Sequence, residues 1–491
     1  MSREAAILAT LIAYKVALLV IGFWAERRTK DGDDFVLAGR RMGPVVAALS
    51  ASASSSSAWT LLGVSGLAFT KGLSALWVFP GCVGGFCINW FVLARPLRAH
   101  AHAHSALTVT DVIAGPRERT GAHAIRIVAS ILVLVSLLTY VASQFLGAGN
   151  NLSETFQGWN VDDSTSIVVG AAIVVAYTLL GGFWAVSVTD TLQGFVMVAT
   201  AIALPIAAVL ELGVGGFVDG VAKVDVPGYQ SVFGNLEISL GIGFVLGLLG
   251  IGLGYPGQPH VVNRFMAMRL GERELRTGRL VAILWAVIVY AGMLVLGLAA
   301  RVLYPEAEGE KAFLTVANGL FPPVVAGIMV AAVLSAVMST TDSQLLVAGS
   351  TVTHDLGLGN RSQRSLLISS RIVILVMSVC AVAFVLLTKD RTIFNLVLFA
   401  WSSLGAAFGP LLLVIVMRGP VAVGPTLLAM ISGWGLSVGF YYARNSLDIG
   451  TWSPVCERVL PFAVALAIAL YGVSRGGGAR RGGGTSAVGT R

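Results

Sequence analysis

Residues 250–259 read Gly-Ile-Gly-Leu-Gly-Tyr-Pro-Gly-Gln-Pro, and they close an apolar run that begins near residue 238. An apolar run of about 20 residues is typical of a helix that spans a lipid bilayer. Four glycines and two prolines within ten residues nevertheless break an α-helix, because proline lacks the amide hydrogen and glycine favours other backbone conformations. The stretch therefore predicts a membrane helix that is interrupted.

A second interrupted helix is predicted near the amino terminus. Residues 50–58 read Ser-Ala-Ser-Ala-Ser-Ser-Ser-Ser-Ala within an apolar run over 44–70. Serine hydroxyls compete for backbone hydrogen bonds and loosen helices. Interruptions at corresponding positions of two halves indicate a transporter built from inverted repeats, with its site near the middle of the bilayer. Packing of small residues is the alternative, but it does not account for Pro-Gly-Gln-Pro.

The composition of the chain is typical of a membrane protein. Of the 491 residues, 56% are hydrophobic and 12% are charged, whereas soluble domains carry about a quarter charged residues. We predict an all-α integral membrane protein with one transporter domain over 1–475 and a disordered, glycine-rich cytoplasmic tail over 476–491. The thirteen predicted spans are 5–24, 44–70, 73–94, 125–148, 165–181, 186–211, 238–259, 279–303, 313–348, 371–388, 393–417, 420–442 and 458–474.

The basic residues predict the orientation of these spans. With the amino terminus outside, 23 of the 33 Lys and Arg residues fall in inside loops or the tail, Arg264 among them, and nine fall outside. This bias follows the positive-inside rule and places the carboxyl terminus in the cytoplasm. The net charge of +8 therefore reflects orientation signals, and we expect no nucleic-acid partner.

Two acidic residues lie inside apolar stretches, Asp190 and Asp342. Ionisable groups within a membrane are costly and usually handle ions or protons. Ser339, Thr340 and Ser343 lie within one helical turn of Asp342, and such oxygens suit a hard cation. The alternatives are solvation of Asp190 at the cytoplasmic mouth of its span, and hydroxyls that bond only to their own helix around Asp342.

Six segments carry a resemblance to a known family. They are Leu-Ala-Gly-Arg-Arg-Met-Gly-Pro at 37–44, Trp-Thr-Leu-Leu-Gly at 59–63, Gly-Gly-Phe-Trp-Ala-Val-Ser-Val-Thr-Asp-Thr-Leu-Gln at 181–193, Gly-Leu-Gly-Tyr-Pro-Gly-Gln-Pro-His at 252–260 with Arg-Phe-Met at 264–266, Ala-Val-Met-Ser-Thr at 336–340 and Phe-Ala-Trp-Ser-Ser-Leu-Gly-Ala-Ala-Phe-Gly-Pro at 399–410. At these motifs the chain resembles the sodium:solute symporter family, and within it the bacterial sodium/proline symporters.

The resemblance implies a bacterial inner-membrane protein that moves a small solute with sodium by alternating access. It implies a five-plus-five inverted-repeat core with broken first and sixth core helices. The first repeat would cover 44–211 and the second 238–417, with an extra helix at 5–24 and two more over 420–474. Sodium is the coupling ion, and we expect no cofactor and no other metal.

The resemblance also assigns site residues. The main sodium site matches Ala53, Ser56, Ala336, Ser339 and Thr340. A possible second cation site matches Asp190, with Asp342 and Ser343 near it. The solute would lie against Ser57, Trp59, Tyr140, Ile251, Tyr255 and Pro259.

Two positions depart from the proline-symporter pattern. Ser55 stands where those proteins have an aspartate that is important for sodium, and Ile251 stands where they have a tryptophan against the solute. Proline is therefore the first candidate solute, while another small amino or carboxylic acid or a different neutral solute also fits. Proton coupling through the two acids and a transporter-like solute sensor remain alternatives. We find no motif typical of an enzyme, and the sequence leaves the oligomeric state open.

Overall fold

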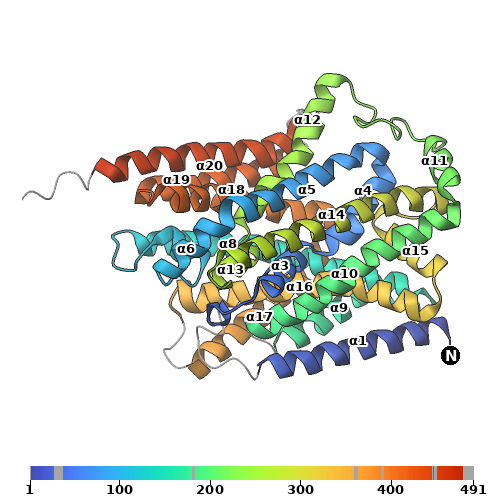
Figure 1. Ribbon diagram of the computed structural model, residues 1–491, viewed down its shortest axis with the longest axis horizontal. Helices are drawn as coiled ribbons and strands as arrows, with labels where there is room; N and C mark the ends of the chain where they lie inside the picture. Colours follow the sequence, from blue (N-terminus) through green and yellow to red (C-terminus); the bar gives the residue numbers. More distant parts are fainter. Residues whose placement is uncertain are drawn as a thin grey trace, which may run out of the picture.

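The computed structural model describes residues 2–26, 37–179, 183–358, 363–388, 392–444, 446 and 450–478. Within these ranges every regular element is a helix, and the only β-type contact is an isolated bridge between Met42 and Met268. Figure 1 shows long helices lying side by side in one bundle, with α1 starting at one end and α20 finishing at the opposite end. The predicted tail lies outside the described residues from 479 onward.

Many of the helices follow one another directly or after a short turn, while the described connection over 223–237 is longer. In chain order they are α1 (Arg3–Glu26), η1 (Ala38–Arg40), α3 (Pro44–Ser55), η2 (Trp59–Gly63), α4 (Val64–Lys71), η3 (Gly72–Trp77), α5 (Val78–Cys87), η4 (Ile88–Leu93), α6 (Ala94–Ala103), α7 (Val109–Ala114), α8 (Ala122–Thr155), η5 (Gln157–Trp159), α9 (Asp163–Thr178), α10 (Phe183–Leu212), α11 (Val214–Ala222), α12 (Ile238–Leu249), η6 (Gly250–Gly257), α13 (Pro259–Ala267), α14 (Glu272–Leu303), η7 (Gly309–Lys311), α15 (Ala312–Leu320), α16 (Pro323–Ser350), η8 (Thr351–Asp355), α17 (Gln363–Leu387), α18 (Ile393–Arg418), α19 (Val423–Ala443), η9 (Gly450–Trp452) and α20 (Ser453–Gly478).

Eleven helical stretches of the described chain are long and apolar enough to cross a membrane. The longest, Trp59–Ala103, has 45 residues, and Figure 1 shows the chain reversing within it between α4 and α5. Gly72, with a φ of +61°, makes this reversal possible because it adopts a conformation that other residues rarely take. The apolar helices α3 and α9 are shorter. The prediction of an all-α, multi-pass membrane protein is therefore confirmed.

The serine-rich interruption lies at the end of α3. The helix stops at Ser55, Ser56 leaves helical geometry with φ −114° and ψ 78°, and the chain resumes as the wide helical turn η2. The Ser55 hydroxyl donates a 2.9 Å hydrogen bond to the Ser52 carbonyl. This is the local side-chain competition that loosens serine-rich helices.

The glycine- and proline-rich interruption lies between α12 and α13. Residues of η6 form a tight 3₁₀ stretch, Gln258 is extended, and Pro259 starts α13, where its missing amide hydrogen costs nothing. A Cβ atom on Gly257 would lie 2.5 Å from the Leu404 carbonyl oxygen and 2.6 Å from the Cα of Gly405. The absence of a side chain therefore lets this break pack directly against the backbone of α18.

The two interrupted helices meet in the middle of the fold. The segment α13 packs against α3, and both contact α16. The long helix α10 packs against α3 and α16 as well. Four elements that are far apart in sequence therefore enclose one buried region, and the candidate site lies there.

One predicted span differs in the structure. The stretch 313–348 is treated as a single long span in the sequence, but it forms two helices, α15 and α16. Pro322 and Pro323 separate them, with Pro322 as the extended N-cap and Pro323 in the first turn of α16. Proline at these positions starts a new helix and prevents the preceding one from continuing.

Candidate functional site

Hydroxyls of α16 face the carbonyls at the end of α3. The Ser339 hydroxyl lies 3.2 Å from the Ala53 carbonyl oxygen, and the Thr340 hydroxyl lies 3.1 Å from the carbonyl oxygen of Ser54. The helix break makes this possible, because the last carbonyls of a helix have no partner further along it. The structure thus brings oxygens from two helices together where the sequence predicts the main sodium site.

The other members of the predicted sodium set join the same group. The Ala336 carbonyl accepts a 3.3 Å hydrogen bond from Ser339, and the amide of Ser56 donates to the carbonyl of Ala53 at 3.2 Å. The hydroxyl of Ser56 is buried and has no hydrogen-bond partner among the described residues. All five side chains are fully buried. A small cation would find carbonyl and hydroxyl oxygens here, the ligands that hard cations prefer.

Asp190 is also fully buried, and an arginine pairs with one of its two oxygens, while its Oδ1 atom has no hydrogen-bond partner among the described residues. Its Oδ2 atom lies 3.0 Å from a terminal nitrogen of Arg264 and accepts hydrogen bonds from Ser50 at 2.8 Å and Ser54 at 3.2 Å. Arg264 belongs to α13 and is 1% exposed. The prediction that Arg264 lies in an inside loop is wrong, because this ion pair stabilises its charge inside the bundle.

Arg264 links all the elements around the site. It donates to Ser50 on α3 at 3.0 Å, to Ser343 on α16 at 2.5 Å and to the carbonyl of His260 in its own helix. Its guanidinium also lies 5.0 Å from the ring centre of Phe183 on α10. The guanidinium therefore occupies the oxygen-rich position between Asp190 and Ser343 that the sequence predicts for a second cation.

Asp342 makes a different set of contacts from its neighbour Ser343. Its Oδ1 atom accepts a hydrogen bond from Thr178 of α9, and its Oδ2 atom has no hydrogen-bond partner in the described chain. The side chain is fully buried. Asp342 is thus a buried carboxylate on the α9 side of α16, whereas Asp190 and Ser343 both bond to Arg264.

The predicted solute residues line a buried aromatic cluster beside the two helix breaks. The Tyr255 ring lies 4.7 Å from that of Trp401, and the Tyr140 ring lies 6.2 Å from the same tryptophan. Trp59 lies 6.4 Å from Tyr290, whose hydroxyl is 2.8 Å from that of Tyr255. These rings come from η2, η6, α8, α14 and α18, so the cluster joins both halves of the chain.

The remaining predicted solute residues are backbone neighbours of this cluster. Ser57 accepts a hydrogen bond from the amide of Trp59 at 3.2 Å, and the carbonyl of Ile251 accepts one from the Trp401 indole at 3.0 Å. Pro259 is the first residue of α13. Tyr290 was not recognised from the sequence, since it lies within a continuous apolar helix with no motif around it.

Known proteins resemble this chain over most of its length. A family model, the sodium:solute symporter family, matches residues 35–433. The sodium/proline symporter of Escherichia coli K12 is 36% identical over 449 residues, which cover 88% of this chain and 87% of that protein. The osmoregulated proline transporter OpuE of Bacillus subtilis is 35% identical and covers 83% of each chain. The high-affinity proline transporter PutP of the same organism is 35% identical, covering 81% of this chain and 84% of that one.

Solved structures with a similar fold also exist. The substrate-bound outward-open state of a Na⁺-coupled sialic acid symporter matches with a TM-score of 0.74 at 17% identity, covering 96% of this chain and 98% of that one. The inward-facing conformation of Mhp1 matches with a TM-score of 0.53 at 14% identity, covering 88% and 91%. At such low identity these matches establish a shared transporter fold and nothing about the solute.

Proposed function

The chain belongs to the sodium:solute symporter family, and from this premise we propose that it imports a small organic solute together with sodium, with proline as the first candidate. One observation gives the main support for this proposal. Two hydroxyls of an intact helix, Ser339 and Thr340, meet the carbonyls that the interrupted helix α3 leaves at its end. Interrupted helices that offer backbone oxygens to a cation are typical of secondary transporters.

The proposed sodium ion takes its ligands from Ala53, Ser56, Ala336, Ser339 and Thr340. Ser56 and Ser57 are adjacent in the break, so a cation held by the first would fix the backbone beside the second. Ser57 begins the wall that contains Trp59, Tyr140, Tyr255, Pro259 and Ile251. Sodium would thereby shape the solute cavity, and this is a coupling free energy between two sites.

A second cation near Asp190, Asp342 and Ser343 would bind only when Arg264 withdraws. The guanidinium bonds to both Asp190 and Ser343, and a cation at that point would meet its positive charge at close range. We therefore assign the coupling ion to the α3–α16 position. The unpartnered Oδ2 atom of Asp342 leaves proton coupling as the second candidate mechanism.

The proposed solute is proline because named relatives carry that description and share most of their length with this chain. Ile251 provides a smaller side chain than tryptophan would, so the aromatic contacts with the solute would come from the rest of the cluster, such as Tyr255 and Trp401. A somewhat larger amino or carboxylic acid therefore also fits the proposal. Transport measurements should therefore include such compounds after proline.

We further propose thirteen spans with two inverted repeats, over 44–211 and 238–417, inside one membrane domain over 1–475. A helix lies over each of the thirteen stretches, and the start of α1 and the end of α20 lie on opposite sides of the bundle (Figure 1). The arginine bias places the start of α1 outside and the end of α20 in the cytoplasm. The bacterial relatives support a place in the inner membrane.

Sodium should stabilise the purified protein against heat, and potassium or choline at equal ionic strength should not. A ligand that binds only the folded state adds about 2.7 kcal/mol of stability at a concentration of 100 times its Kd. We expect a rise of several degrees in the melting temperature with sodium chloride, and a further rise when proline is added with sodium. Equal melting temperatures in the three salts would contradict a sodium site.

A further inference from the structure

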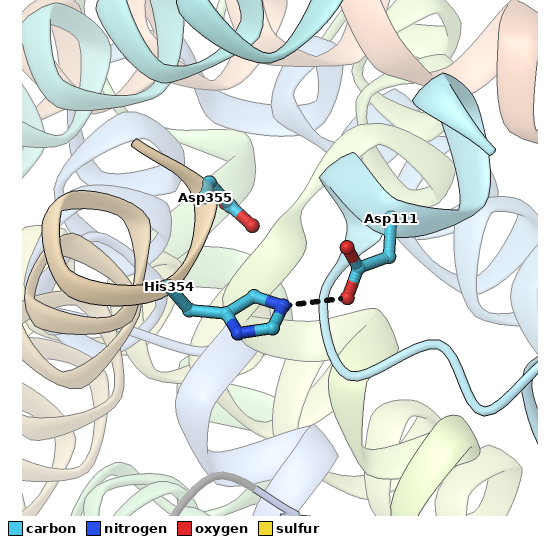
Figure 2. Close-up of side chains that lie close together, drawn as sticks. All are labelled: Asp111, His354 and Asp355. Carbon is cyan, nitrogen blue, oxygen red and sulfur yellow. Dashed lines mark hydrogen bonds and ion pairs between the residues drawn. The ribbon is translucent and has the colours of Figure 1, made fainter. Parts of the chain in front are cut away.

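Three potential metal ligands meet at one end of the bundle, away from the sodium and solute residues. Asp111 belongs to the short helix α7, and His354 and Asp355 lie in η8, the wide turn that ends α16. Their ligand atoms all lie within 4.8 Å of one another. Figure 2 shows the ring of His354 reaching Asp111 and the carboxylate of Asp355 turned toward the same space.

This combination of one imidazole and two carboxylates suits a divalent transition-metal ion. Zinc binds histidine nitrogen at about 2.0–2.1 Å and carboxylate oxygen at about 2.0–2.2 Å, so two of its ligand atoms lie at most about 4.3 Å apart. The His354 Nε2 atom lies 2.9 Å from Asp111 Oδ2. A metal between them would replace the proton that they now share, and it would require only a small shift of the side chains.

Neighbouring groups hold both carboxylates in place. The amides of Leu107 and Thr108 donate to Asp111 at 2.9 and 3.2 Å, and the hydroxyl of Thr108 donates to Asp355 at 2.7 Å. Such outer partners orient metal ligands and are a regular part of metal sites. Asp111 and Asp355, two of the three ligands, are therefore already held in place before a metal binds.

The charged groups in and beside the cluster affect how strongly it would bind a cation. Arg126 pairs with Asp111 at 2.6 Å and neutralises one of the two carboxylates. Asp111 also accepts hydrogen bonds from the amides of Leu107 and Thr108, and such bonds favour the ionised form of a carboxylate. The nearby guanidinium lowers the affinity for a metal, and we expect binding weaker than that of a structural zinc site.

The cluster is also accessible. A cavity of about 820 Å³ is lined by Asp111 and His354, among other residues. The side chains of His354 and Asp111 are 28% and 13% exposed, whereas Asp355 is 3% exposed and lies behind them. A hydrated ion in the cavity would therefore meet His354 and Asp111 first and Asp355 last.

We propose that Asp111, His354 and Asp355 form a binding site for a divalent transition-metal ion of the zinc class. In the proposed orientation this site faces the cytoplasm. The ion would join the end of α16 to α7, which precedes α8. Because α16 carries Ser339 and Thr340, and provided that the proposed function holds, the bound ion would slow any transport step that separates the end of α16 from α7.

The test is zinc binding to the full-length, tag-free protein by calorimetry, after a chelator has been used and removed. All samples carry Cys380→Ser, since Cys380 is an exposed thiol that can bind zinc. We expect one saturable site, and His354→Gln and Asp355→Asn should each lower the affinity by about tenfold or more. His104→Gln is the matched control, because His104 lines the same cavity and bonds to the His100 carbonyl of its own helix at 3.0 Å.

The outcomes separate this proposal from the proposed function. Absence of zinc binding, or equal affinity in His354→Gln and its parent protein, would overturn the site whether or not the protein transports sodium. Zinc added to the cytoplasmic face of reconstituted protein should slow uptake in the parent but not in Asp355→Asn. Equal inhibition of both proteins would show that zinc acts elsewhere and would overturn the link to transport. Melting temperatures of the variants near that of the parent exclude misfolding as the cause.

Discussion

Replacing Asp190 with asparagine should abolish sodium-driven uptake and destabilise the protein by about 3–5 kcal/mol. The change leaves the guanidinium of Arg264 in a fully buried place without its counter-charge. It also disturbs the hydrogen bonds that Asp190 receives from Ser50 and Ser54 of the interrupted helix. Thermal unfolding of the purified variant and solute uptake in vesicles measure the two effects.

A double variant separates the ion pair from a general effect on folding. Removing both charges with Asp190→Asn and Arg264→Met should restore much of the stability lost in either single variant, because the lone buried charge is gone. Asp219→Asn is the control, since Asp219 is an exposed acid on α11. An Asp190→Asn protein as stable and active as its parent would contradict the assigned role of this pair.

The second large effect concerns the sodium ligands. Ser339→Ala and Thr340→Val should each raise the sodium concentration needed for half-maximal uptake by about ten- to a hundredfold, because a hydrogen-bonding group on a charge contributes about 1.5–3 kcal/mol. The apparent affinity for the solute at saturating sodium should change much less. Initial uptake rates across a sodium titration distinguish the two constants.

Thr341→Val is the matched control for this experiment. Its hydroxyl bonds at 2.7 Å to the Val337 carbonyl of its own helix, so its loss removes a neighbouring hydroxyl without removing a proposed ligand. We expect the sodium dependence of this variant to stay close to that of the parent. A shift in Thr341→Val as large as that in Thr340→Val would mean that the hydroxyls act through the helix and not through the ion.

The interruptions could be predicted from sequence because their causes are local. A run of serines around Ser55 and two prolines flanking Gly257 weaken any helix, whatever surrounds it. The break between α15 and α16 had an equally local cause in Pro322 and Pro323, but the apolar character of the whole stretch masked it. Hydropathy identifies a stretch that can cross a membrane and does not show where the helix stops.

The pairing of Arg264 could not be predicted in the same way. Its partner Asp190 lies 74 positions earlier in the chain, and counting basic residues near span ends treats every arginine as a loop residue. The contact between Asp111 and His354 could not be predicted for the same reason. Asp111 and His354 are 243 positions apart, so no spacing along the chain connects them.

The predicted solute residues fall between these cases. Ser57, Tyr255 and Pro259 lie at the breaks, and their place could be anticipated once the breaks were recognised. Tyr140 lies within the continuous helix α8, and the resemblance to a known family assigned it to the solute site. Trp401 of α18 was not among the predicted solute residues. Tyr290 had neither signal, and only the packing of α14 against the two breaks brings its hydroxyl to Tyr255.

Uptake of labelled proline into proteoliposomes is the direct test of sodium-coupled transport. The same preparation is measured with an inward sodium gradient, with an inward potassium gradient and with a proton gradient, at equal membrane potential. One charge moving down 100 mV releases about 2.3 kcal/mol, enough for accumulation on the order of tens-fold. We expect accumulation above equilibrium only with the sodium gradient. Equal accumulation without sodium, driven by protons, would contradict it.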